Sequence, residues 1–383
     1  MRVLTARALD AGLPDAELLG LLDDALSGRI TLLPLAGDDD HSRGVAEALR
    51  AGEPIDDAVA LVVPTSGSTG FPKGAMLSTA AVLASAAATH DRLGGPGRWL
   101  LALPPHHIAG LQVLIRGLVA GTAPVRLDVS GGFDVTALPG AIAALGSGRR
   151  YLSLVSNQLA AALRDPAAAA ALAETDAVLL GGGPAPAPLL DSAAAARIPV
   201  VRTYGMSETA GGCVYDGVPL NGVRVRVDGG RVRLGGPTLA CGYRNPVTPN
   251  PFAEPGWFAT DDLGELDGDG RLRVLGRVDD GILTGGLTVL PQLVEAALLA
   301  HPAIAEAVVF GTPEPRLGQQ VTAALVLSPD AAAPTLGELR RHLEAAGLAG
   351  TAAPRVAHVV EEIPRRGIGK PDRRALVARF SGA

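Results

Sequence analysis

The sequence has few aromatic residues, few cysteines, no excess of positive charge and no long apolar run. Aromatic residues make up 3% of 383 residues and the formal net charge is −6, which argues against base stacking or a basic surface for nucleic acid. Cys213 and Cys241 are too few for a disulfide framework or a zinc site. Residues 100–103 and 111–120 are much shorter than the roughly 20 residues of a membrane-spanning helix, and the N-terminus lacks a signal-peptide core. We therefore expect a soluble cytoplasmic protein with no nucleic-acid partner and no integral membrane association.

The remaining composition is that of a folded protein with very little lysine. Hydrophobic residues make up 48% of the chain and charged residues 19%, and the length allows two or three domains of about 100–200 residues each. Only two of the 33 basic residues are lysines, Lys73 and Lys370. A lysine that persists where arginine is otherwise used is a candidate for a role that needs a compact, mobile ammonium group.

Short apolar runs alternate with helical patterns between residues 58 and 205. We expect strands over 58–64, 99–103, 124–129, 151–155, 177–180 and 199–204, and helices over 78–92, 110–120 and 135–145. Ser78 is the expected N-cap of the first of these helices. Alternation of this kind predicts a largely parallel sheet with helices on both faces.

The pattern changes near residue 222. Residues 222–236, GVRVRVDGGRVRLGG, alternate at every second position across a DGG turn, which predicts a hairpin and a small antiparallel or barrel-like subdomain over 222–276. A helix–strand–strand–helix–strand order follows. The predicted fold is a large α/β N-terminal domain over 1–278, with layered, mostly parallel sheets and a small β-barrel-like subdomain. A smaller, mobile α+β C-terminal domain over 279–383 completes it.

Residues 65–74, TSGSTGFPKG, directly follow a predicted buried strand. The hydroxyl groups, the exposed N–H groups of the glycine-rich backbone and the ammonium of Lys73 suit a polyphosphate. The spacing is not that of a Walker A loop, because glycine follows Lys73. A flexible Ser/Gly turn is the alternative, but a string of ten residues is much more specific than such a turn.

This string resembles the phosphate loop of the adenylate-forming superfamily, which contains acyl- and aryl-CoA ligases, peptide-synthetase adenylation domains and luciferases. These enzymes use ATP to convert a carboxylate into an acyl-adenylate, release pyrophosphate and pass the acyl group to a thiol. The resemblance implies ATP, Mg²⁺ and coenzyme A as cofactor and co-substrates. It assigns to ATP the loop residues Thr65, Ser66, Gly67, Ser68, Thr69, Gly70 and Lys73.

A histidine-containing segment and a glycine-rich segment follow in the family order. In LPPHHIAG, over 103–110, His107 takes the family position between the nucleotide and acyl sites; the alternative is a loop histidine that caps a helix. His106 replaces the usual aromatic residue, and its role stays open. GGGP resembles the loop on the adenine side, where glycines let the backbone approach a flat base. It comprises Gly181, Gly182, Gly183 and Pro184.

The segment YGMSET, over 204–209, is similar to the Tyr-Gly-x-Thr/Ser-Glu segment of the family. The resemblance implies that Tyr204 stacks on adenine and that Glu208 holds the Mg²⁺ that bridges ATP oxygens. A carboxylate is a suitable ligand for this hard cation. It assigns the phosphate contact to Ser207 or Thr209. The nucleotide-binding residues of this segment are Tyr204, Gly205, Met206, Ser207 and Thr209.

Residues 257–263, WFATDDL, and 276–286, GRVDDGILTGG, resemble the ribose and hinge segments. Asp262 takes the position of the carboxylate that accepts both ribose hydroxyls, whereas Asp261 stands where glycine is usual. Arg277 is expected to contact ribose or phosphate, and Asp279 to be the pivot of the C-terminal domain. The CoA channel is assigned to Gly285 and Gly286.

Residues 364–370, PRRGIGK, resemble the C-terminal motif whose lysine reaches the α-phosphate and the acyl carboxylate. Lys370 would stabilise the charge that develops as the carboxylate attacks phosphorus. The resemblance implies that the C-terminal domain then swings about Asp279, removes Lys370 and admits CoA. Together, Lys370, Lys73, His107 and Glu208 are the expected catalytic residues.

The motifs cover roughly residues 58–383 and leave a shortened, unmatched segment over 1–57. Within the superfamily, the chain most resembles actinobacterial o-succinylbenzoate–CoA ligases of menaquinone biosynthesis, whose substrate carries a second carboxylate that needs a cationic or multi-donor partner. Another aryl- or acyl-CoA ligase, a module that loads a carrier protein and a non-enzymatic relative are the alternatives, and a homodimer is allowed. The candidate pocket residues are His106, Arg116, Gln158, Arg202, Ser207, Thr209, Gly211 and Gly212.

Overall fold

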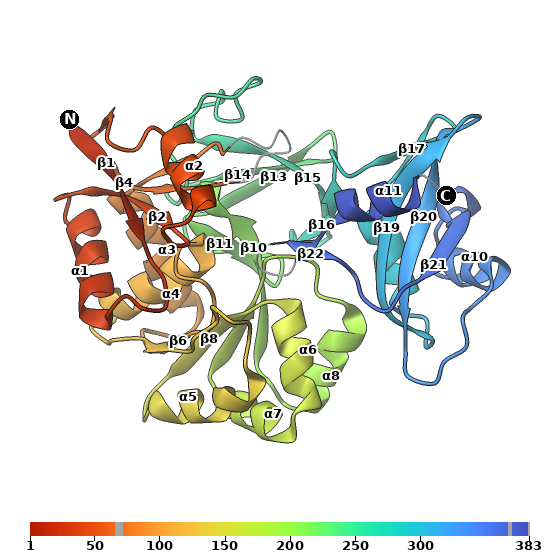
Figure 1. Cartoon of the computed structure of the whole chain (residues 1–383), viewed down its shortest axis with the longest axis horizontal. Coiled ribbons are helices and arrows are strands. Elements are labelled where there is room, and N and C mark those ends of the chain that lie inside the picture. Colours follow the sequence, from red (N-terminus) through yellow and green to blue (C-terminus); the bar gives the residue numbers. More distant parts are fainter. Residues whose placement is uncertain (66–71, 367–369, 382–383) are drawn as a thin grey trace.

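The computed structural model (Figure 1) describes residues 1–65, 72–366 and 370–381, without the side chains of Arg366 and Lys370. A large α/β part contains three sheets and ends with a strand at Arg277, and a smaller α+β part begins at Ile282. The fold class is the one expected from the sequence. In the described part of the chain, no helix is both long and apolar enough to cross a membrane.

The first sheet has the order β3-β1-β2-β4-β5, with parallel pairing of β1 with β2 and of β2 with β4. Residues before position 57, which carry no recognised motif, thus supply three of its five strands. All five residues of β4 are buried, as expected for a continuous apolar run, and β4 leads directly to Thr65. The strands are β1 (Arg2–Ala8), β2 (Thr31–Leu35), β3 (Pro54–Ile55), β4 (Val59–Val63) and β5 (Ala75–Ser78).

The second sheet has seven strands in the order β12-β11-β10-β9-β8-β6-β7. The five strands β6 to β10 are parallel to one another. The strand expected over 124–129 is reduced to β7 at the sheet edge, where Arg126 donates hydrogen bonds to the carbonyl of Leu13 and to Asp15. The strands are β6 (Arg98–Leu101), β7 (Val125–Arg126), β8 (Arg150–Leu154), β9 (Ala177–Leu180), β10 (Val200–Met206), β11 (Gly211–Tyr215) and β12 (Val218–Pro219).

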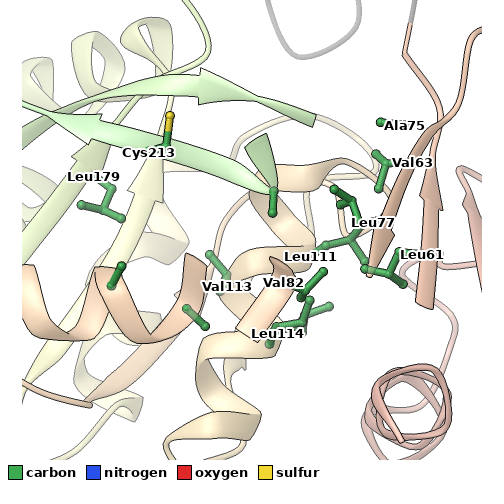
Figure 2. Packing of buried hydrophobic residues seen from close by; sticks show 14 of the residues in the cluster. Leu61, Val63, Ala75, Leu77, Val82, Leu111, Val113, Leu114, Leu179 and Cys213 are labelled. Carbon is green, nitrogen blue, oxygen red and sulfur yellow. The ribbon is translucent and has the colours of Figure 1, made fainter. Parts of the chain in front are cut away.

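Helices α3 (Thr79–Arg92) and α4 (Ile108–Val119) lie between the two sheets. Figure 2 shows side chains of this layer, including Leu77, Val82 and Leu111, in one apolar cluster. Ser78 caps α3 by accepting a hydrogen bond from Ala81 N, as expected. The remaining helices of the large part are α1 (Asp15–Leu26), α2 (Asp40–Ala48), α5 (Leu138–Ala144), α6 (Ser156–Arg164), α7 (Pro166–Ala173) and α8 (Ala187–Ala195), of which α5 to α8 cover the outer face of the second sheet.

The predicted β-rich segment forms a four-stranded antiparallel sheet, β13-β14-β15-β16, and its first hairpin turns at Gly229 and Gly230 as expected. In the smaller part, neighbouring residues of one strand face opposite sides: Val309 packs with α9 and α10, and Phe310 packs with α11. The elements are β13 (Arg224–Asp228), β14 (Arg231–Gly235), β15 (Trp257–Leu266), β16 (Leu272–Arg277), β17 (Ile282–Thr284), β18 (Leu287–Val289), α9 (Pro291–Leu298), β19 (Ile304–Glu314), β20 (Gly318–Leu327), α10 (Leu336–Ala345), β21 (Val356–Val359), β22 (Arg365–Arg366), β23 (Lys370–Pro371) and α11 (Arg373–Phe380).

Candidate active site

The motif segments follow the carboxyl ends of strands. The segment of His107 comes after β6, Gly181–Pro184 after β9 and Ser207–Thr209 after β10. Because these three strands are parallel, their carboxyl ends meet at one edge of the sheet, which is where open α/β sheets bind ligands. Strands β15 and β16 add a pair of directly opposed residues, Asp262 and Arg277.

Tyr204 and Asp262 are joined across 58 residues of sequence. The Tyr204 hydroxyl donates a 2.6 Å hydrogen bond to Asp262 Oδ2, and Thr260 Oγ1 accepts one from Asp262 N. Asp262 is only 7% exposed. Burial raises the pKa of Asp262, while the hydrogen bond from Tyr204 and the charge of Arg277 oppose this shift. The predicted ribose carboxylate is therefore a desolvated acceptor held in a fixed orientation.

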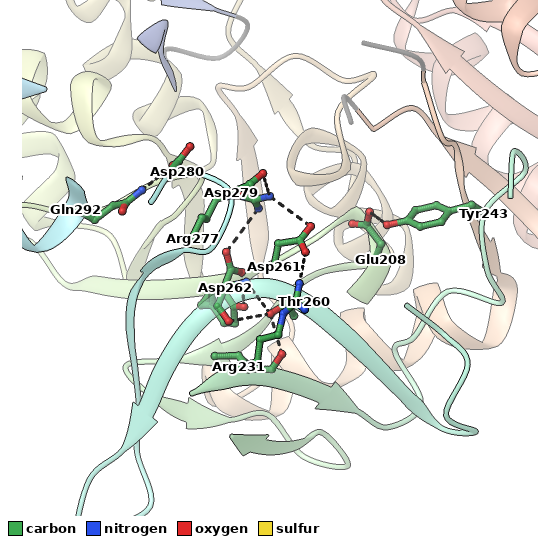
Figure 3. A network of polar contacts seen from close by, with 12 residues as sticks. Glu208, Arg231, Tyr243, Thr260, Asp261, Asp262, Arg277, Asp279, Asp280 and Gln292 are labelled. Atoms are coloured by element: carbon green, nitrogen blue, oxygen red, sulfur yellow. Dashed lines mark hydrogen bonds and ion pairs between the residues drawn. The ribbon is translucent and has the colours of Figure 1, made fainter. Parts of the chain in front are cut away.

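Arg277 lies among three carboxylates (Figure 3). Its Nε and one terminal nitrogen lie 2.8 and 2.9 Å from the two oxygens of Asp279, and it also lies 3.6 Å from an oxygen of each of Asp261 and Asp262. The hydrogen bonds with Asp279 raise the pKa of Arg277 above its ordinary value. Burial alone would raise the pKa of Asp279, but the hydrogen bonds and charge of Arg277 outweigh it and the pKa is lowered.

Asp261, which stands at the usual glycine position, has its own partner. Arg231 on β14 donates a 2.6 Å hydrogen bond to Asp261 Oδ1, and Val278 N donates one to the main-chain carbonyl of Asp261. The extra carboxylate is thus accommodated by an arginine from the neighbouring strand, and Asp261 and Asp262 both lie within the continuous strand β15.

Glu208 and Lys73 meet at a residue that the motif analysis does not include, Tyr243. The Tyr243 hydroxyl donates a 2.6 Å hydrogen bond to Glu208 Oε1, and Lys73 Nζ lies 5.4 Å from the centre of the Tyr243 ring. The chain has only four tyrosines. A tyrosine in the Gly- and Pro-flanked segment CGYRNP is the sequence signal that could have indicated this residue.

The phosphate loop is described at its two ends. Lys73 N donates to the carbonyl of Thr65 at 3.3 Å, so the ends of the loop are adjacent. Thr65 Oγ1 is buried and lacks a hydrogen-bond partner among the described residues, which fits a hydroxyl that binds a ligand oxygen. The predicted ligands Ser66, Gly67, Ser68, Thr69 and Gly70 lie outside the described residues.

The structure separates the two hydroxyls of the YGMSET segment. Thr209 is 1% exposed, and its Oγ1 donates to the carbonyls of Met206 and Gly211 and accepts a bond from Met206 N. Thr209 therefore holds the turn, and Ser207 is the better candidate for a phosphate contact.

Two of the predicted glycines lie in β10 and in the loop after β9. Gly205 lies in the irregular pairing of β10 with β11. In the Gly181–Pro184 loop, a side chain at Gly181 would collide with Thr203.

Arg116 is a buried cation in α4. It is 3% exposed and its Nε has no hydrogen-bond partner among the described residues. Its guanidinium carbon lies 5.0 Å from the centre of the Trp99 ring, and one terminal nitrogen is 3.5 Å from the Tyr215 hydroxyl. Burial lowers the pKa of Arg116. One helical turn closer to His107, Gln112 Oε1 is also buried without a partner, and Gln112 packs against Gly211.

The side chains of the polar pocket candidates Gln158 and Arg202 already have partners within the protein. The amide of Gln158 donates to the carbonyl of Ala102 and accepts from Val155 N, and thereby fixes the start of α6. Arg202 is exposed and pairs with Asp216. Gly212 lies in β11 beside Thr203.

His106 lines a cavity of about 470 Å³ that is bounded by residues of the N-terminal segment and by residues 101–106 and 126–130. This cavity contains none of the predicted nucleotide residues. His107 is the N-cap residue of α4 but makes no side-chain capping bond, which argues against the purely capping role.

Two consecutive aspartates at the predicted hinge bind different parts of the chain. Asp279 binds Arg277 of β16, whereas Asp280 accepts a 2.7 Å hydrogen bond from Gln292 and lies 3.5 Å from Arg373, both in the smaller part. Gly285 and Gly286 form the tip between β17 and β18, with φ of +57° and +81°.

Lys370 lies in β23, where its backbone pairs with Arg366 of β22; its side chain lies outside the described parts. Figure 1 shows β22 on the side of the smaller part that faces the larger one. In the described residues, no group of three or more His, Cys, Asp or Glu side chains could hold a metal ion.

Comparisons with known proteins show the family of the chain. The chain matches the AMP-binding enzyme family over residues 13–241 and the AMP-binding enzyme C-terminal domain over 293–370. The family match thus extends into the N-terminal segment that the motifs leave unmatched. A probable 2-succinylbenzoate–CoA ligase of Mycobacterium tuberculosis is 64% identical over 382 residues, which cover 99% of both chains.

Solved structures are similar as well. o-Succinylbenzoate CoA synthetase (MenE) of Bacillus subtilis, in complex with the acyl-adenylate intermediate OSB-AMP, is 30% identical with a TM-score of 0.73, over 97% of this chain and 82% of that one. The same enzyme with ATP and magnesium ion is 28% identical with a TM-score of 0.72, over 97% and 79%. The chain belongs to the AMP-binding enzyme family, within the adenylate-forming superfamily.

Proposed function

We propose that this protein is a 2-succinylbenzoate–CoA ligase of menaquinone biosynthesis. In the first half-reaction, a carboxylate oxygen of the acid attacks the α-phosphorus of ATP and displaces pyrophosphate, giving the acyl-adenylate. In the second, the thiol sulfur of CoA attacks the acyl carbon and displaces AMP. The observation that carries the proposal is the convergence of Tyr204, Asp262 and Arg277, from separate motif segments, in one set of polar contacts.

The nucleotide contacts follow from these positions. Asp262 accepts the ribose hydroxyls, and Arg277, already paired with Asp262, lies beside the same sugar. Tyr204 stacks on adenine, with the Gly181–Pro184 loop close to the base. Ser207 and the residues of the phosphate loop donate to phosphate oxygens.

Lys73 and Glu208 serve the phosphates in different ways. Lys73 offsets phosphate charge, and the carboxylate of Glu208 is a hard oxygen ligand that fits Mg²⁺ arriving with ATP. Bound with the nucleotide, Mg²⁺ lowers the charge on the oxygens that the acid approaches. His107, at the start of α4, stands where the phosphate meets the acyl group.

The segment over 279–383 acts as a mobile domain in this proposal. Lys370 approaches the α-phosphate during adenylation and leaves it when the domain turns about Asp279. The attachments of Asp279 to Arg277 and of Asp280 to Arg373 support a pivot at this peptide, because each aspartate is tied to a different part. Gly285 and Gly286 at the hairpin tip then line the CoA channel.

Arg116 is our candidate for the second carboxylate of 2-succinylbenzoate. Its guanidinium contacts Trp99 and Tyr215 but pairs with no carboxylate among the described residues, and its buried Nε has no hydrogen-bond partner there, so an anion would find an available cation. Gln112 places the same helix against Gly211, a predicted pocket residue. Arg202 is less suited because it is exposed and already pairs with Asp216.

The partners of this function are the acid, ATP and CoA, and we propose a cytoplasmic location without nucleic acid. A homodimer is compatible with this function. Product analysis by mass spectrometry tests the proposal: 2-succinylbenzoate, Mg·ATP and CoA should give the acyl-CoA, AMP and pyrophosphate. Formation of an adenylate that is transferred only to a carrier protein would favour the carrier-loading alternative.

A further inference from the structure

A loop between β14 and β15 joins two separate motif segments through its main chain. This loop, residues 240–245, hydrogen-bonds with the segment that follows the phosphate loop and with the segment of Glu208. The bonds are Met76 N to Gly242 O, Arg244 N to Gly74 O, Asn245 N to Lys73 O and Ala240 N to Glu208 O, with lengths of 2.9, 2.8, 3.0 and 2.9 Å. The loop therefore fixes the backbone of Lys73 relative to that of Glu208.

One side chain of this loop contacts both functional groups. The Tyr243 hydroxyl donates to Glu208 Oε1 at 2.6 Å, and the face of its ring lies 5.4 Å from Lys73 Nζ (Figure 3 shows the hydrogen bond). Among the ion pairs of the described residues, none joins Lys73 to Glu208. Tyr243 thus contacts both the carboxylate of Glu208 and the ammonium of Lys73.

The Tyr243 ring is itself held in place. Phe252 packs edge-on against it with ring centres 5.5 Å apart, and Phe252 in turn packs on Phe258 at 4.8 Å. Phe258 belongs to β15, the strand that carries Asp262.

We propose that Tyr243 is a positioning residue for the phosphate end of the site: its hydroxyl orients the Glu208 carboxylate toward Mg·ATP, and its ring keeps Lys73 available for phosphate. The inference rests on the proposed function, in which Glu208 and Lys73 contact Mg·ATP. A carboxylate already held in its binding orientation loses less conformational freedom when a cation binds. One hydrogen bond occupies one lone pair of the carboxylate and leaves the others for the metal.

The test measures ATP binding by calorimetry, without the acid, over a range of Mg²⁺ concentrations. The value compared between variants is the Mg²⁺ concentration at which ATP binding is half-maximal. Tyr243→Phe keeps the ring and removes only the hydroxyl, so this concentration should rise about tenfold. Tyr243→Leu also removes the surface beneath Lys73, so ATP affinity at saturating Mg²⁺ should fall as well. Tyr151→Phe is the matched control, since it removes a tyrosine hydroxyl bonded to the carbonyls of Leu93 and Gly95, and it should leave both values unchanged.

An unchanged Mg²⁺ dependence in folded Tyr243→Phe would overturn the inference. A lowered requirement would overturn it too, because the hydroxyl would then compete with the metal. Glu208→Gln distinguishes a failure of the role proposed for Glu208 from a failure of the role proposed for Tyr243. If it binds Mg·ATP with the wild-type Mg²⁺ dependence, the role proposed for Glu208 fails; if it does not, and Tyr243→Phe behaves as wild type, only the role of Tyr243 fails.

Discussion

Arg277 and Asp279, two residues apart, form a bidentate ion pair with hydrogen bonds of 2.8 and 2.9 Å. The same guanidinium lies 3.6 Å from Asp262, the proposed ribose ligand. One cation therefore connects the predicted hinge with the predicted nucleotide site. If Asp279 is the pivot of the C-terminal domain, as proposed, a change in nucleotide occupancy that moves Arg277 also alters the constraint on that pivot.

Separate substitutions of this pair should have different effects. Arg277→Gln removes a charge beside the ribose and the phosphates, so we expect ATP affinity to fall about tenfold. Asp279→Asn leaves Arg277 in place and should keep ATP affinity within about twofold, while it changes the relative rates of adenylation and thioester formation. Calorimetry and single-turnover kinetics measure these quantities. Equal loss of ATP affinity in the two variants would contradict a distinct hinge role for Asp279.

Asp262→Asn should weaken ATP binding, and its effect on the stability of the folded protein should depend on pH. The folded-state pKa of Asp262 lies above its ordinary value of 3.8. Between these two values the folded protein binds the proton more readily than the unfolded chain, so this residue's contribution to stability falls as pH rises through the window and stays low above it. Asparagine does not titrate, so the Tm of the variant relative to wild type should be more favourable at about pH 7 than at about pH 4.

The same variant should bind ATP about a hundredfold more weakly, because the ribose hydroxyls lose a charged acceptor. Differential scanning fluorimetry and calorimetry on one preparation give both results. A relative Tm that falls with rising pH, or unchanged ATP affinity, would contradict the assignment.

The two lysines should divide between the steps. Lys370→Ala should abolish adenylate formation and leave transfer to CoA from preformed adenylate largely intact, because Lys370 is proposed to act only in the first step. Lys73→Ala should mainly impair ATP turnover. Quenched-flow measurements of each half-reaction test this, and equal loss of both half-reactions in Lys370→Ala would contradict its role.

Arg116→Met should affect the acid rather than ATP. Loss of a buried cation that pairs with a carboxylate should raise the KM for 2-succinylbenzoate about tenfold to a hundredfold. The Tm should stay equal or rise, because an apolar side chain replaces a buried charge without a carboxylate partner. Arg202→Met is the matched control and should leave this KM unchanged. If Arg202→Met raises the KM and Arg116→Met does not, the second carboxylate binds at Arg202.

Local patterns in the sequence predicted most of the fold. The Ser78 cap, the hairpin at Gly229 and Gly230, and the run that forms β9 depend on neighbours within a few residues, and all three are found. The edge strand β7 is shorter than expected, and the side chain of Arg126 binds Leu13 and Asp15, which are more than a hundred positions away. Such long-range contacts leave no local signal.

In the candidate site too, the sequence indicated some features, whereas others depend on the folded structure. Motif spacing indicated Tyr204, Asp262 and Arg277, which lie together. It did not indicate that Thr209 holds its own turn or that His106 lines a separate cavity, because both depend on which way a side chain points. Tyr243 was missed because it lies outside the recognised motif segments, and its contact with Glu208 follows only from the folded chain.

ATP–pyrophosphate exchange tests the ligase function most directly, measured with 2-succinylbenzoate, benzoates, fatty acids and amino acids. We expect strong exchange with 2-succinylbenzoate, weaker exchange with acids that lack a second carboxylate, and loss of exchange in Asp262→Ala. Exchange that prefers another acid would contradict the substrate, and no exchange with any acid would contradict the ligase function itself.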